Sequence, residues 1–213
     1  MTLNGAARRA RAIREAILRR RRRSLAAKRL GESVPPMAQL HLGCGAIRLE
    51  GWVNIDIDRG AHPDIRVDLR GGLPATRRSI TYIFSEHVFE HLTLNDGVRL
   101  LADCQCSLVK GGVMRIAMPD LEQLVDRYQR DWRDQTWLDD PAYREIDSPA
   151  NMLNFAMRSW GHLYLYDFAE LERRLREAGF EKLRRCEWQR SEHDALRGLE
   201  QRPDSLLIVE ATA

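Results

Sequence analysis

Short apolar segments alternate with longer segments of helical periodicity along most of this 213-residue chain. Five segments are short and largely β-branched, a pattern typical of buried strands. They are Ala38–Leu42, Val53–Ile57, Ile65–Val67, Ile80–Phe84 and Val113–Ala117. Two more strand-like segments, Lys182–Gln189 and Ser205–Ala211, follow nearer the carboxyl end. This alternation predicts an α/β fold with a mainly parallel sheet and an antiparallel pair at one edge.

Three segments between these strands carry helical patterns. They are Asn95–Val109, Leu121–Arg130 and Phe168–Ala178. The sequence Lys110-Gly111-Gly112 is expected to end the first helix, because basic residues and glycines are typical of helix carboxyl ends. Asp167 is expected to cap the third helix, since Glu170 stands three residues later in a capping-box pattern.

The first thirty residues differ from the rest in charge. The whole chain has 34 Lys and Arg against 31 Asp and Glu, a net charge of +3. Residues 1–30 hold eleven of the basic residues and one acid, so they carry +10 and the remaining residues carry −7. We predict a basic helical extension (residues 1–31) before a domain of residues 32–213, with the helix-breaking residues 31–36 at the junction.

Three roles for this extension stay open. It is a solvated segment, a helix attracted to anionic lipid, or a contact for nucleic acid or another copy of the chain. No run approaches the roughly 18 apolar residues of a membrane span, and the amino-terminal charges precede no apolar signal core. The four cysteines match neither a disulfide framework nor paired zinc ligands. We expect a cytoplasmic protein with reduced thiols, and membrane association through the extension stays one of its open roles.

The most informative motif is the sequence His41-Leu42-Gly43-Cys44-Gly45, directly after the first strand. Two glycines separated by one residue allow a tight turn and a close approach of the backbone to a ligand. A nicotinamide-dependent dehydrogenase is disfavoured, because Arg48 stands where a third glycine belongs. Asp56 also follows Gly43 by only 13 residues, against the roughly 20 that such enzymes require.

Four motifs occur in a fixed order along the chain. They are Leu-Gly-Cys-Gly at 42–45, Gly-Trp-Val-Asn-Ile-Asp at 51–56, Ser-Glu-His-Val-Phe-Glu-His-Leu at 85–92 and Gly-His-Leu-Tyr-Leu-Tyr-Asp at 161–167. Together they resemble the class I S-adenosylmethionine-dependent methyltransferases over residues 38–211, in particular a small bacterial branch. The resemblance implies a Rossmann-like seven-stranded sheet of order 3-2-1-4-5-7-6 with helices on both faces. It also implies S-adenosylmethionine as the cofactor and an O or N atom as the methyl acceptor.

The resemblance further implies a set of cofactor-binding residues at the carboxyl ends of the strands, where open α/β sheets bind ligands. The set is Leu42, Gly43, Cys44, Gly45, Asp56, Asp68, Leu69 and Ser85. Asp56 would accept hydrogen bonds from both ribose hydroxyls, and Asp68 from the adenine amino group. Two features depart from the family pattern. Ten residues from Gly43 to Trp52 leave little room for a first helix, and Thr81 replaces an aspartate found in many members.

The segment from His87 to His91 matches H-x-x-E-H, in which two histidines on one helix face bind zinc in some peptidases. A peptidase is disfavoured, because the segment follows a strand in a methyltransferase-like order. Three other roles stay open: a divalent-ion site at His87, Glu90 and His91, packing of a short helix, and a general base. We predict that His87 acts at the acceptor side and that His91 packs.

The acceptor pocket is expected between the fifth strand and the last helix, where this superfamily often builds it. The candidates there are Trp132, Trp137, Tyr143, Trp160, His162, Tyr164 and Tyr166. Ser85-Glu86-His87 stands in place of an Asn-Pro-Pro-Tyr motif, which argues against methylation of nucleic-acid bases or glutamine. We expect a small-molecule or glycan acceptor and no nucleic acid on the main domain. The alternative is a regulatory or scaffold protein that binds S-adenosylmethionine without turnover.

Overall fold

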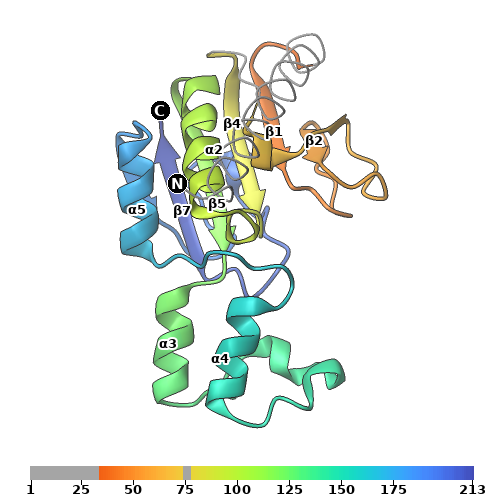
Figure 1. Cartoon of the computed structure of the whole chain (residues 1–213). Helices are drawn as coiled ribbons and strands as arrows, with labels where there is room; N and C mark the ends of the chain where they lie inside the picture. The colour runs from red at the N-terminus through yellow and green to blue at the C-terminus, as the bar shows by residue number, and fades with distance from the viewer. Residues whose placement is uncertain (1–33, 74–77) are drawn as a thin grey trace, which may run out of the picture.

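The computed structural model describes residues 34–73 and 78–213. The basic extension and its junction at residue 31 lie outside the described residues. The strands form one sheet of order β3-β2-β1-β4-β5-β7-β6, which confirms the predicted order (Figure 1). No helix among the described residues is long and apolar enough to cross a membrane.

The seven strands divide into a parallel part and an antiparallel edge. Their bounds are β1 Ala38–Leu42, β2 Val53–Asp56, β3 Ile65–Arg66, β4 Ile80–Glu86, β5 Leu108–Met118, β6 Lys182–Arg185 and β7 Leu207–Thr212. Strands β1 to β5 are parallel, whereas β7 runs antiparallel to both β5 and β6. The predicted antiparallel edge is therefore confirmed. The parallel strands end at one edge of the sheet, and the predicted site residues follow there.

Within residues 34–73 and 78–213, four α-helices and five short 3-10 helices connect the strands. The α-helices are α2 Leu94–Ser107, α3 Leu121–Gln129, α4 Pro149–Arg158 and α5 Phe168–Glu177. The 3-10 helices are η1 Leu69–Gly71, η2 Phe89–His91, η3 Thr136–Asp139, η4 Pro141–Tyr143 and η5 Asp194–Leu196. Asp167 caps α5 as predicted, because its side chain accepts from the Glu170 N–H.

The two faces of the sheet are covered differently. Helices α2 and α5 lie on one face and share its main core (Figure 1). On the other face, Phe84, Ala117 and Ile208 pack against side chains from loops, including Trp52 and Leu199. The described chain between β1 and β2 contains no helix, as the ten-residue spacing predicted. The loops thus cover part of the surface that helices cover on the opposite face.

The predicted end of the first helix is wrong. Helix α2 ends at Ser107, and Lys110-Gly111-Gly112 lies inside β5. Leu108 already pairs with Ile80 of β4, so the chain becomes extended before the glycines. Gly111 has φ +79, and its N–H donates to the carbonyl oxygen of Ala213 over 2.8 Å. The glycines therefore lie at an irregularity in strand β5 and do not end helix α2.

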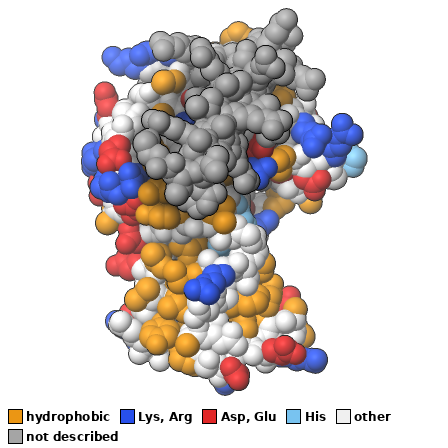
Figure 2. Space-filling model, in the orientation of Figure 1, with side chains coloured by type: hydrophobic (Ala, Val, Ile, Leu, Met, Phe, Trp, Pro, Cys, Tyr) orange, Lys and Arg blue, Asp and Glu red, His pale blue; other side chains and the backbone are white. Residues whose placement is uncertain are grey.

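Helices α3 and α4 build a second lobe beyond the carboxyl ends of the parallel strands (Figure 1). Its core consists of Leu124, Met152, Ala156 and Leu165. Helix α4 was not predicted from the sequence, although Ser148 caps it and Pro149 occupies its first turn, both typical of a helix start. Hydrophobic side chains also gather on the outside of this lobe (Figure 2). Exposed hydrophobic residues in this part of the chain are Val125, Tyr128, Met157, Trp160 and Leu163.

Candidate functional site

The glycine turn after β1 adopts the left-handed conformation at two positions. Gly43 has φ +65 and Gly45 has φ +51, which other residues adopt only with strain. A Cβ atom on Gly43 would lie 2.3 Å from Cγ2 of Val88, whereas one on Gly45 would meet no atom within 4 Å. Gly43 is therefore required by packing against the segment after β4, and Gly45 by its backbone conformation.

Asp56 joins this turn to the end of β2. Its Oδ2 accepts from the Gly45 N–H over 2.8 Å, and its Oδ1 accepts from the Asp58 N–H over 2.8 Å. Each carboxylate oxygen can accept more than one hydrogen bond, so both retain acceptor capacity. The structure thus brings together Gly43, Gly45 and Asp56, three of the predicted cofactor residues.

Asp68 and Leu69 lie farther along the same edge, after β3. Asp68 accepts from the Arg70 backbone N–H and from Nε and Nη2 of the Arg70 side chain at 2.9 and 3.0 Å. Leu69 is buried at the start of η1. An adenine amino group that reached Asp68 would share this carboxylate with Arg70.

Leu42, Cys44 and Ser85 line the middle of the edge. Leu42 is fully buried and pairs with Ser85 of β4. Burial and the charge of Asp56 raise the pKa of the Cys44 thiol to about 11, so it stays protonated at neutral pH. The Ser85 hydroxyl is fully buried and makes no hydrogen bond among the described residues. A buried hydroxyl without a partner indicates a position where a ligand could supply one.

The segment from His87 to His91 does not form an α-helix. Only Phe89–His91 make a 3-10 turn, and His87 precedes it with φ +52. The peptidase arrangement, two histidines on one α-helical face, is therefore not present here. His87 is buried, with Nδ1 3.0 Å from Oε1 of Glu90 and Nε2 3.7 Å from Oδ1 of Asp204. It connects the end of β4 to a segment far along the chain.

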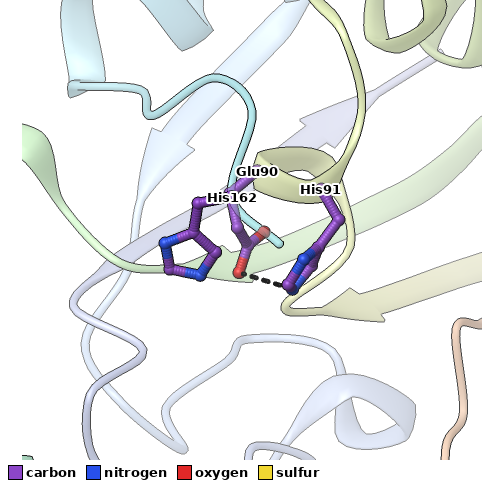
Figure 3. Close-up of side chains that lie close together, drawn as sticks. All are labelled: Glu90, His91 and His162. Atoms are coloured by element: carbon purple, nitrogen blue, oxygen red, sulfur yellow. Dashed lines mark ion pairs between the residues drawn. The ribbon is translucent and has the colours of Figure 1, made fainter. Parts of the chain in front are cut away.

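His162 lies next to this segment. Its Nδ1 is 2.7 Å from the carbonyl oxygen of Ala156, and its ring centroid is 5.0 Å from that of His91. Burial lowers the pKa of His162, which favours the neutral imidazole. One ligand atom each from Glu90, His91 and His162 lies within 4.8 Å of the others (Figure 3). Sequence reasoning named all three residues but did not group His162 with the other two.

A cavity of about 170 Å³ lies beside His162, between the second lobe and the sheet. Its lining includes Asp120, Gln135, Trp137, Trp160, His162 and Asp204. Trp137 and Trp160 stand edge to face, 5.2 Å apart. Sequence reasoning missed Asp120, Gln135 and Asp204, because no local motif marks them.

The other predicted pocket residues lie outside this lining. The Tyr164 hydroxyl donates to Glu170 over 3.1 Å, and Tyr166 is buried in the main core. Burial raises the pKa of Tyr166 to about 12, so it remains a phenol. Trp132 and Tyr143 pack within the second lobe. Of the seven candidates, Trp137, Trp160 and His162 line the cavity.

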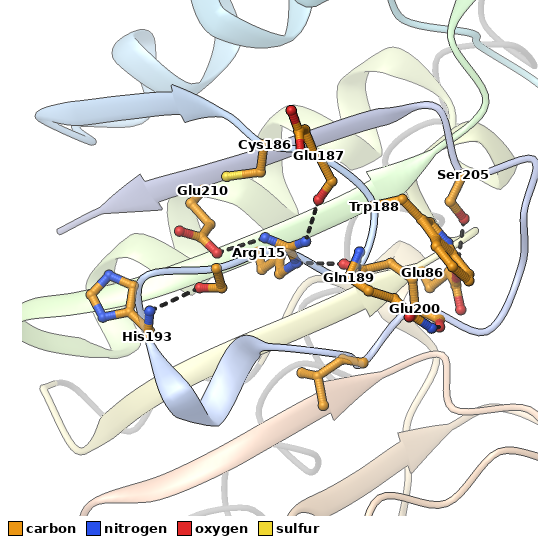
Figure 4. A network of polar contacts seen from close by, with 12 residues as sticks. Glu86, Arg115, Cys186, Glu187, Trp188, Gln189, His193, Glu200, Ser205 and Glu210 are labelled. Carbon is orange, nitrogen blue, oxygen red and sulfur yellow. Dashed lines mark hydrogen bonds and ion pairs between the residues drawn. The ribbon is translucent and has the colours of Figure 1, made fainter.

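A buried polar network holds the segment that carries Asp204 (Figure 4). The Glu86 carboxylate accepts from the backbone N–H groups of Gln201 and Arg202 and from the Ser205 hydroxyl, which lies 2.7 Å away. Arg115 of β5 pairs with both Glu200 and Glu210 and is itself fully buried. These contacts fix the loop before β7 against the sheet, and Asp204 with it.

Comparisons with solved structures found similar folds. No protein-family model and no curated protein sequence matches the chain. An S-adenosylmethionine-dependent methyltransferase from Archaeoglobus fulgidus matches with a TM-score of 0.50 and 15% identity, covering 90% of this chain and 94% of that one. Another from Thermotoga maritima has a TM-score of 0.49 and 15% identity, with 96% of each chain covered. At such identities the likeness concerns the fold, which is the Rossmann-like fold of these enzymes.

Proposed function

We propose that this chain is an S-adenosylmethionine-dependent methyltransferase. One observation carries the proposal: the Asp56 carboxylate at the end of β2 binds the Gly45 N–H in the glycine turn after β1. This joins a turn with two glycines to a carboxylate with spare acceptor capacity, the combination that a ribose and an amino-acid end require. It lies at the ligand-binding edge of a sheet whose order is that of the methyltransferase fold.

The residues at this edge fit the proposed cofactor. Leu42, Gly43, Cys44 and Gly45 would hold its methionine end, Asp56 its ribose, and Asp68 with Leu69 its adenine. The buried Ser85 hydroxyl would supply a further polar contact. The bound cofactor would supply a methyl group activated by a sulfonium. The chain's own tasks are then to bind, to orient the acceptor and to remove a proton from it.

The second lobe supplies the proposed acceptor site. The cavity combines two indole rings with three carboxylates and two amides, groups that suit a hydroxyl-bearing ring. At about 170 Å³ it is smaller than the roughly 300 Å³ or more of a typical ligand pocket. These features support a sugar or the terminal unit of a glycan as acceptor. His87, beside Asp204 at the cavity, would act as the base for a hydroxyl acceptor.

Calorimetry with S-adenosylmethionine and its demethylated product tests the cofactor site. Asp56→Ala should weaken binding about 30- to 150-fold, which corresponds to roughly 2–3 kcal/mol of lost hydrogen bonding. Asp58→Ala is the matched control, since it removes a charge from the same loop, where Asp58 caps only Gly60. It should keep the affinity within about threefold. Equal losses in both variants, or none in Asp56→Ala, would reject the assignment.

Turnover separates an enzyme from a regulatory or scaffold protein. Cell extract incubated with the protein and methyl-labelled cofactor should yield a labelled acceptor. His87→Gln should lower that yield while cofactor affinity stays unchanged. Tight binding without any labelled product would favour the regulatory alternative. Full labelling by His87→Gln would remove His87 from the proposed catalytic role.

A further inference from the structure

The carboxylate of Glu90, in η2 just after β4, is buried, and its nearest charged partner is the imidazole of His87, whose Nδ1 lies 3.0 Å from Oε1. The Glu90 side chain is 0% exposed, and neither oxygen makes a hydrogen bond within the part of the chain that the structure describes. An ionised carboxylate in such surroundings is strongly disfavoured unless a positive group compensates it. The surroundings of Glu90 therefore indicate where a cation would lie.

Two further imidazoles, besides that of His87, face this carboxylate. His91 Nε2 is 3.9 Å from Oε1 of Glu90, and a ring nitrogen of His162 completes a set of ligand atoms within 4.8 Å of one another. Figure 3 shows the three side chains converging from two segments of the chain. Ligands bound to one zinc ion at about 2.0–2.2 Å lie at most about 4 Å apart. Small side-chain rotations would bring the three atoms to that spacing.

His162 has one ring nitrogen free to bind an ion. Its Nδ1 lies 2.7 Å from the Ala156 carbonyl oxygen, which can only accept, so Nδ1 must carry the proton. The Nε2 lone pair of the neutral ring is then available. Metal-ligating histidines usually donate their other nitrogen to a carbonyl or carboxylate in this way.

The backbone holds His162 opposite Glu90. The N–H groups of Leu163 and Tyr164 both donate to the Glu90 carbonyl oxygen, over 2.7 and 3.2 Å. Trp160 and Gly161 have φ values of +55 and +86, so the chain reverses just before His162. This placement depends on main-chain contacts and does not require a bound ion.

We propose that Glu90, His91 and His162 form a binding site for a divalent transition-metal ion, with zinc as its probe. Two imidazoles and one carboxylate suit zinc and leave a coordination position open. Magnesium and calcium are disfavoured, because both prefer oxygen ligands. His162 also lines the cavity, so the ion would lie beside it. His87, 3.0 Å from Oε1 of Glu90, would orient this carboxylate.

Metal titration of the full-length chain tests the site independently of methyl transfer. Chelator-treated protein is titrated with zinc sulfate and, separately, with magnesium chloride, and its metal content is measured by elemental analysis. We expect one zinc ion per chain and no magnesium. His162→Gln and Glu90→Gln should weaken zinc binding at least about 100-fold. His193→Gln removes a histidine that packs on Tyr82 outside the cluster, and should bind zinc as the parent does.

Thermal melting keeps the test decisive if a variant loses stability. Because a neutral amide needs no compensating cation, Glu90→Gln should melt no lower than the chelator-treated parent and should not respond to zinc. The parent should melt higher when zinc is added. All titrations use a Cys106→Ser background, which removes an exposed thiol that could bind zinc elsewhere. Undiminished zinc binding by His162→Gln, or no zinc binding by the parent, would overturn the proposal.

Discussion

Two groups of residues meet at the carboxyl edge of the sheet, and they are built differently. The cofactor group lies within residues 42–69 and is joined largely by short-range backbone contacts, such as Gly45 N–H to Asp56. The acceptor group draws on η2, the second lobe and the loop before β7, which lie far apart in sequence. Local turns therefore specify the first group, whereas only the packed fold assembles the second.

The two groups also differ in how completely their polar atoms are paired. Both Asp56 oxygens accept backbone hydrogen bonds, and Asp68 is paired with Arg70. Of the predicted cofactor residues, Ser85 has a buried hydroxyl that makes no hydrogen bond among the described residues. In the acceptor group, neither oxygen of Glu90 nor Nε2 of His87 makes one there, although Glu90 Oε1 lies 3.0 Å from Nδ1 of His87. Unpaired buried groups are rare in proteins and are often explained by a ligand or ion. The acceptor group is therefore where a bound species would change the energetics most.

The largest expected effect is the loss of the network that anchors the acceptor group. Arg115→Ala leaves the carboxylates of Glu200 and Glu210 without their buried partner, which should destabilise the chain by about 3–5 kcal/mol. Urea denaturation measures the change. Arg130→Ala, which removes an exposed pair with Asp126, should cost about 0.5 kcal/mol or less. A loss below about 1 kcal/mol for Arg115→Ala would show that the network is dispensable.

The next prediction tests whether the second lobe can be weakened alone. Met152 is fully buried in its small core, so Met152→Ala should cost about 2–5 kcal/mol locally. Hydrogen exchange should then accelerate in α3 and α4 and stay slow in β1 and β4. Cofactor affinity should remain within about threefold. A parallel loss of protection in the sheet would show that the two groups are not independent.

Within the cofactor group, the two glycines should respond unequally to substitution. Gly45→Ala adds only the strain of a left-handed residue, about 1–2 kcal/mol. Gly43→Ala adds the same strain and a collision with Val88, about 1–3 kcal/mol more. Denaturation of both variants measures the difference. Adding Val88→Ala to the Gly43→Ala protein should recover this additional loss of stability. No recovery would contradict the packing explanation.

The smallest effect concerns His41 in β1, beside the cofactor group. Burial lowers its pKa, against the opposing effects of the hydrogen bond that it donates to Asn54 and of the charge of Asp56. Below about pH 6.5, His41 is therefore protonated in the unfolded chain but remains neutral in the native chain. The free energy of unfolding then falls as the pH drops, by at most about 1.4 kcal/mol per pH unit. Denaturation at pH 7.5 and 5.5 should show a weaker pH dependence in His41→Gln than in His193→Gln. Equal slopes would exclude a contribution from His41.

The α/β fold class followed from local patterns in the sequence, whereas the strand order and the predicted cofactor residues came from the resemblance to the methyltransferases. Segments of about ten residues were enough to predict the alternation of strands and helices, the glycine turn and the absence of a first helix. Element ends were less readable. Gly111 suggested a helix end, but pairing with Ala213 placed it in a strand. Helix α4 was not predicted, even though Ser148 and Pro149 are typical of a helix start.

The sequence by itself determined the α/β architecture and the turn that meets Asp56, since both depend on neighbouring residues and strand periodicity. Only the tertiary structure decided which histidine faces Glu90, that Asp204 lies beside His87, and that Val88 requires a glycine at position 43. Each of these contacts joins residues far apart along the chain. Their relative positions depend on how whole elements pack, and no local pattern of side chains predicts which distant residues come into contact.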